Sequence, residues 1–89
     1  MAAKMSEKTK RVWDEIMYEV ESARATTYEE WLGKTKDSPS LRKLFRDKQN
    51  GIIRGYWDGR TLAALERRGL IKYFDNMERD CWEVYVIEK

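Results

Sequence analysis

The fold is decided by residues 60–71, which read RTLAALERRGLI. Leu62 and Leu65 lie three residues apart, a spacing that places both side chains on one face of a helix. Gly69 is the residue type that most often ends a helix, because glycine adopts the left-handed conformation without steric cost. The pattern therefore predicts a helix over residues 59–68.

Two strands are expected after this helix. Residues 70–73 and 81–87 are rich in apolar and aromatic side chains, and the second stretch is also rich in β-branched ones. Residues 74–80, which separate them, read FDNMERD and are polar enough to turn the chain. We therefore predict a C-terminal antiparallel β-hairpin.

Three more helices are predicted upstream. Apolar residues recur at three- and four-residue spacing over about residues 6–25, which indicates a long amphipathic helix. A short helix is expected over residues 27–32, where Thr27 and Glu30 have the spacing of a capping box. A basic amphipathic helix is expected over residues 39–49, because Ser-Pro opens it and Asn-Gly follows it.

The predicted fold class is α+β, with three to four helices followed by the hairpin. Residues 51–57 combine glycines with bulky apolar side chains, and we expect them to pack on the core as a turn or a short extended piece. A chain of 89 residues has room for one domain, so residues 1–89 are interpreted as a single domain. Residues 1–5 are expected to be disordered.

Composition excludes two classes of protein. Hydrophobic residues make up 42% of the chain and charged residues 38%, a balance unlike that of disordered or membrane proteins. No uncharged run is longer than five residues, which excludes a transmembrane helix and the core of a signal peptide. We therefore expect a cytoplasmic protein without a membrane partner.

The side chains needed for most catalytic and metal sites are missing. The chain has no histidine, which excludes the usual zinc sites and histidine-based catalysis. Cys81 is the only cysteine, so no internal disulfide can form, and we interpret it as a small apolar side chain with no histidine to activate it. The prediction is a protein that is not an enzyme and holds no metal or cofactor.

The net charge of +2 conceals an uneven distribution. Residues 1–33 carry five Lys/Arg and seven Asp/Glu, a net charge of −2. Residues 34–72 carry eleven and four, a net charge of +7, and residues 73–89 carry two and five, a net charge of −3. A basic block between two acidic ones indicates an anionic partner, with a solvated basic face as the alternative.

Residues 60–71, followed by a strand, a polar tip and a second strand, resemble the recognition helix and wing of winged helix-turn-helix domains. The resemblance takes in the first helix and the helix at 27–32, so it covers most of the chain. It implies a small winged-helix DNA-binding protein that regulates transcription, with helix 59–68 in the major groove. Paired helices of that motif are joined by about three or four residues, so helix 39–49 is an alternative positioning helix, with residues 51–57 as an elaborated turn.

The helix at 59–68 has a face suited to reading DNA. Arg60, Ala63, Ala64 and Arg67 lie opposite its leucines, and the small alanines let the backbone approach a groove while the arginines reach base edges or phosphates. The alternative is a surface helix whose arginines pair with Glu66 or with the acidic first helix. The candidate base or groove contacts are Arg60, Thr61, Ala64, Arg67 and Arg68.

The helix at 39–49 could supply phosphate contacts beside it. Its basic face is also what a solvated surface helix would carry. The predicted hairpin tip has Asp75, Glu78 and Asp80 against a single Arg79, whereas a wing that grips phosphate is normally basic. The candidate phosphate contacts are Arg42, Lys43, Arg46, Lys48 and Arg54.

The sequence leaves two classes of partner possible, DNA and protein. The first hypothesis is double-stranded DNA bound by a homodimer, with Tyr18 and its neighbours on the first helix as the dimer surface. The second is a protein-protein interaction module or inhibitor on the same scaffold, to which Tyr56 could contribute; burial is favoured for Trp57. Three tryptophans at apolar-periodic positions are expected in the core: Trp13, Trp31 and Trp82.

Overall fold

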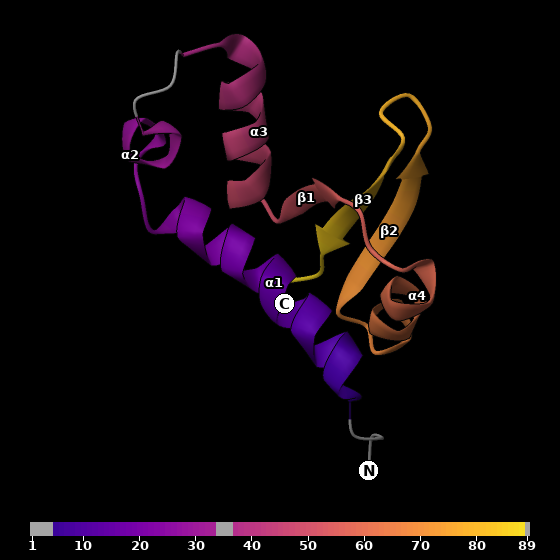
Figure 1. The fold of residues 1–89 in the computed structure, drawn as a ribbon. Coiled ribbons are helices and arrows are strands. Elements are labelled where there is room, and N and C mark those ends of the chain that lie inside the picture. The colour runs from indigo at the N-terminus through magenta and orange to yellow at the C-terminus, as the bar shows by residue number, and fades with distance from the viewer. Residues whose placement is uncertain (1–4, 34–36, 89) are drawn as a thin grey trace.

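The computed structural model of the protein describes residues 5–33 and 37–88. It is an α+β fold, as the sequence predicts, in which a three-stranded antiparallel sheet packs against helices (Figure 1). The elements in chain order are α1 (Glu7–Arg24), α2 (Tyr28–Leu32), α3 (Pro39–Gln49), β1 (Ile52–Gly55), α4 (Gly59–Arg67), β2 (Ile71–Asn76) and β3 (Cys81–Val86).

Each helix begins at a polar N-cap. The side-chain oxygen of the cap accepts a hydrogen bond from a backbone N–H two or three residues later, which satisfies one of the amides that the first turn leaves unpaired. The four predicted helices are confirmed, and their ends lie within one residue of the expected ones. The ends could be predicted because the capping residues are local in sequence. The caps are Ser6, Thr27, Ser38 and Asp58.

The sheet has the strand order β1-β3-β2, so the last strand of the chain is the central one. The predicted hairpin of β2 and β3 is confirmed, but β2 continues to Asn76, three residues beyond its expected end. The Asn76 side chain closes the turn by accepting a hydrogen bond from the Arg79 backbone N–H at 3.2 Å. Residues 51–57 contain strand β1, which pairs with β3 over four residues.

The core lies between the inner face of the sheet, α1 and α4 (Figure 1). Met5 also packs against this core, whereas residues 1–4, for which disorder is expected, lie outside the described residues. None of the described helices is long and apolar enough to cross a membrane. The fully buried large side chains are Ile16, Val20, Ile53, Leu62, Leu65, Ile71 and Val84.

The tryptophans lie at the margins of the core. Trp13, Trp57 and Trp82 are half-buried and pack against it. The Trp57 ring covers Gly55 so closely that a Cβ there would lie 2.7 Å from a ring carbon. Trp31 belongs instead to a separate cluster with Tyr28 of α2 and Phe45 of α3, with ring centroids 5.3 to 6.3 Å apart. This aromatic cluster joins α2 to α3.

Candidate nucleic-acid interface

Helix α4 is linked to α1 at its start. The Asp58 side chain accepts a hydrogen bond from the Arg60 backbone N–H at 3.1 Å and forms an ion pair with Lys8 of α1 at 2.8 Å. These contacts, with the Lys8 hydrogen bond as the largest cause, lower the pKa of Asp58 below its usual value. The first turn of α4 is therefore tied to α1.

The two faces of α4 differ sharply in exposure. Leu62 and Leu65 are fully buried. Thr61 is only 5% exposed, so its side chain does not reach the outer face, contrary to its prediction as a base or groove contact. Arg60 and Arg67 are exposed on the opposite face. Between them lie the half-buried Ala63 and Ala64, and Arg68 is exposed at the C-cap.

The charged side chains of α3 are held by neighbouring elements. Arg42 forms an ion pair with Asp37 and lies over the Tyr28 ring, with its guanidinium carbon 5.8 Å from the ring centroid. Hydrogen bonds from Arg42 are the largest cause of the lowered pKa of Asp37. Lys48 has a side chain that is only 14% exposed, because it pairs with Glu19 of α1 at 3.3 Å.

Arg54 of β1 is also engaged. Its guanidinium lies 3.2 Å from an oxygen of Asp47 on α3 and 3.4 Å from an oxygen of Glu83 on β3, and its side chain is 21% exposed. Arg42, Lys48 and Arg54 are thus three phosphate candidates that already have anionic partners within the protein. The other two, Lys43 and Arg46, are exposed.

A polar network on the outer face of the sheet was not found by sequence reasoning. Glu83 accepts hydrogen bonds from the Tyr85 hydroxyl and from Asn76 at 3.1 Å. These donors, Tyr85 first, together with Arg54, hold the pKa of Glu83 below its usual value, and the Glu83 carboxylate raises the pKa of Tyr85. The signal that could have found this network is the Arg54–Glu83 cross-strand pair, which is recognisable only once β1 is known to pair with β3.

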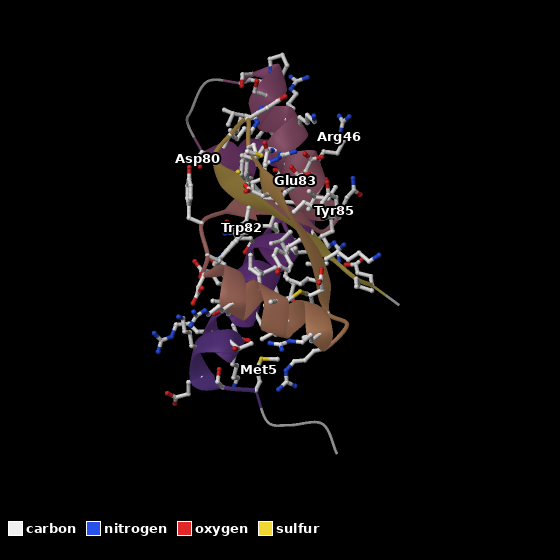
Figure 2. The ribbon with its side chains drawn as sticks, turned by 90° about the vertical axis from the view of Figure 1, so that its right-hand side faces the viewer. Met5, Arg46, Asp80, Trp82, Glu83 and Tyr85 are labelled. Atoms are coloured by element: carbon white, nitrogen blue, oxygen red, sulfur yellow. The ribbon has the colours of Figure 1, made fainter. Side chains whose placement is uncertain are left out.

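The two basic helices do not share a surface. Figures 1 and 2 show α3 at one end of the molecule and α4 at the other, with the sheet between them. In the chain, β1 lies between α3 and α4, so of the two expectations for residues 51–57 the short extended piece is confirmed, and the elaborated turn of the alternative motif contains a strand. The hairpin tip points towards the α3 end and exposes its acidic side chains: Asp75, Glu78 and Asp80.

Within residues 5–33 and 37–88, no group of three or more carboxylate or thiol side chains is placed to hold a metal ion. Comparison with known protein families, curated proteins and solved structures finds no match for this chain. The candidate interface therefore rests on the residues of α4 themselves.

Proposed function

We propose that this chain is a small winged-helix DNA-binding protein that places the outer face of α4 in the major groove of double-stranded DNA, in the manner of a transcriptional regulator. The observation that carries the proposal is the exposure of Arg60 and Arg67 on either side of two alanines, on a helix whose opposite face is anchored in the core. Exposed arginines can form bidentate hydrogen bonds with guanine, and small side chains allow close approach.

The dimensions of α4 suit this role. Arg60 and Arg67 are seven residues apart, which corresponds to about 10 Å along a helix axis, or roughly three base pairs. The major groove admits a single helix. Ala64 lies at the centre of this span and would face the base edges or a thymine methyl group.

The phosphate contacts in this proposal are few. Because α3 lies at the other end of the molecule, Lys43 and Arg46 do not flank α4. With Arg60, Arg67 and Arg68 as the contacting cations, affinity would fall by about 40-fold between 50 and 200 mM salt. So few contacts favour binding by a dimer, since two half-sites multiply specificity.

The experiment is a titration of labelled duplex DNA at low and high salt with two matched variants. Arg60→Ala/Arg67→Ala should weaken binding by at least about 30-fold, because each lost arginine contact is worth about 1–3 kcal/mol. Lys43→Ala/Arg46→Ala removes the same charge from α3 and should change binding by less than about threefold. Equal effects of the two variants, or no binding at low salt, would contradict the proposal.

A second candidate function is a protein-binding module, favoured by exposed apolar side chains at the α3 end. Tyr56 is 78% exposed and Met77 is 84% exposed, beside the acidic tip. Aromatic and methionine side chains are enriched in protein interfaces. Absence of DNA binding at low salt by the unaltered protein would favour this second function.

A further inference from the structure

A groove separates α3 from the β-hairpin at the end of the molecule opposite α4. It has a volume of about 440 Å³ and is lined by residues of α3, of β1 and the segment after it, and of the hairpin. Figure 1 shows α3 and the hairpin tip rising on either side of β1. Small-molecule sites typically measure about 300–1,000 Å³, so the groove has the size of a ligand site.

One wall of the groove is apolar. Leu41 and Leu44 of α3 line it and are half-buried. Phe45, which shares a face of α3 with Leu41, packs against Tyr28 and Trp31 of α2, whereas Leu41 and Leu44 stay half-buried beside the groove. Tyr56 stands at the groove with an exposed ring. A ligand with an apolar body would bury these surfaces.

The charge in the groove is positive. Its charged side chains are Lys43, Arg54 and Arg79, and no carboxylate lines it. Arg54 is compensated by Asp47 and Glu83. Over residues 5–33 and 37–88, the structure places no carboxylate within ion-pair distance of Lys43 or Arg79.

Lys43 and Arg79 come from opposite walls, one from α3 and the other from the hairpin turn. Among the described residues neither side chain forms an ion pair, so both are available to an anion in this space, although Glu78 and Asp80 flank Arg79 in the sequence. A charge-assisted hydrogen bond to each would hold a single acidic group between them. The apolar wall then lies next to the rest of the ligand.

We propose that this groove is a binding site for an organic anion with an apolar body, held by Lys43 and Arg79 at its acidic group and by Leu41 and Leu44 at its body. The site shares no residue with α4, so it is separate from the proposed DNA interface. The ligand class follows from the combination of cations and leucines, since either feature alone would suit many partners.

The test uses two fluorescent probes of similar shape. One is 8-anilinonaphthalene-1-sulfonate, which has an apolar body and a negative charge, and the other is the uncharged N-phenyl-1-naphthylamine. The folded protein should bind one equivalent of the anionic probe at least about tenfold more tightly than the neutral one, as one charge-assisted contact would give. Equal binding of the two probes would overturn the assignment of an anion.

Three variants locate the site. Lys43→Gln/Arg79→Gln should weaken binding of the anionic probe by at least about tenfold and change the affinity for the neutral probe by less than about twofold. Leu44→Ala should weaken the binding of both probes. Lys10→Gln/Arg11→Gln removes one lysine and one arginine from the exposed surface of α1 and should change neither. Near-ultraviolet circular dichroism of each variant excludes binding to a loosened core.

Competition identifies the source of the ligand. Decanoate should displace the bound sulfonate, whereas decan-1-ol at the same concentration should not. Displacement by an acidic amphipathic peptide but not by decanoate would overturn the proposal of a small-molecule site and assign the groove to a protein partner. An unchanged response in Lys43→Gln/Arg79→Gln would overturn it as well, because the probe would then be bound elsewhere.

Discussion

Helices α3 and α4 look alike in sequence and differ in what their charges do. Both are amphipathic and both carry several cations. On α3 and the adjoining β1, Arg42, Lys48 and Arg54 each pair with a carboxylate of the protein. On α4, Arg60 and Arg67 stand exposed beside alanines.

The difference arises from the surroundings of each helix. α3 packs against α1, α2 and β1. Glu19 of α1 reaches Lys48, Asp37 just before α3 reaches Arg42, and Asp47 of α3 pairs with Arg54 of β1. On the outer face of α4, Arg60 and Arg67 are exposed, and no helix or strand of the described residues covers them. A local excess of positive charge therefore does not reveal which cations are free to meet an anionic partner; the packing of neighbouring helices decides that.

The largest expected effect is on stability, from the inner face of α4. Leu65→Ala removes a fully buried side chain from the core and should lower the free energy of unfolding by about 4 kcal/mol. Urea denaturation followed by circular dichroism measures this change. A loss below about 1 kcal/mol would mean that α4 is not anchored in the core as described.

On the inner face of α3, Phe45→Ala should cost slightly less, about 3 kcal/mol, because its cluster with Tyr28 and Trp31 lies apart from the main core. The same change should release α2 selectively. Hydrogen exchange is the readout: amides of residues 28–32 should lose protection, while those of α4 should keep theirs. Uniform loss of protection would show that the two helices belong to one cooperative unit.

Arg54 is the cation that two carboxylates of the protein already compensate. Arg54→Met should destabilise the protein by about 1–2 kcal/mol, because it leaves Asp47 and Glu83, both largely buried, without a cation. Arg60→Met, an equivalent change on α4, should alter stability by less than about 0.5 kcal/mol, since Arg60 is exposed. Thermal denaturation of both variants measures the two losses of stability. Equal losses would contradict the difference between a paired cation at Arg54 and an exposed one at Arg60.

The smallest effect is a pH dependence at the α3 end. The pKa of Glu83 is lower in the folded state, so its carboxylate stabilises the fold above its unfolded pKa, and that contribution is lost as pH falls through the folded pKa. Glu83→Gln should flatten the loss of stability between about pH 5 and pH 3. Glu66→Gln, an exposed carboxylate on α4, serves as the control. Equal acid sensitivity in Glu83→Gln and the unaltered protein would contradict the role of this network.

The helices and the hairpin could be predicted because their signals are local. The N-caps precede each helix directly, and Leu62 and Leu65 define the inner face of α4 within one turn. The burial of Thr61 was missed although it follows the same rule: Thr61 lies four residues before Leu65, so the two share a face. The Thr61 hydroxyl does not prevent burial beside Leu62 and Leu65, because the threonine methyl group is apolar.

The partners of Arg54 could not be predicted, because they are distant in sequence. β1 has four residues, and its pairing with β3 joins Arg54 to Glu83, 29 positions further along the chain. No local pattern contains that pairing. The same pairing gives Arg54 a carboxylate partner within the protein. A short extended piece over residues 51–57 could be expected from the sequence, but the strand that it pairs with could not.

The placement of β3 has a consequence for how the chain acquires its structure. β3 is the central strand and follows both of its neighbours in sequence, so β1 and β2 have no common partner until residues 81–86 have been synthesised. Long-range pairing of this kind slows folding, because a large loop must close before its contacts form. During translation the helices can form first, while the apolar face that β3 will cover stays open. Removal of residues 81–88 would therefore leave a chain with helices but without a sheet.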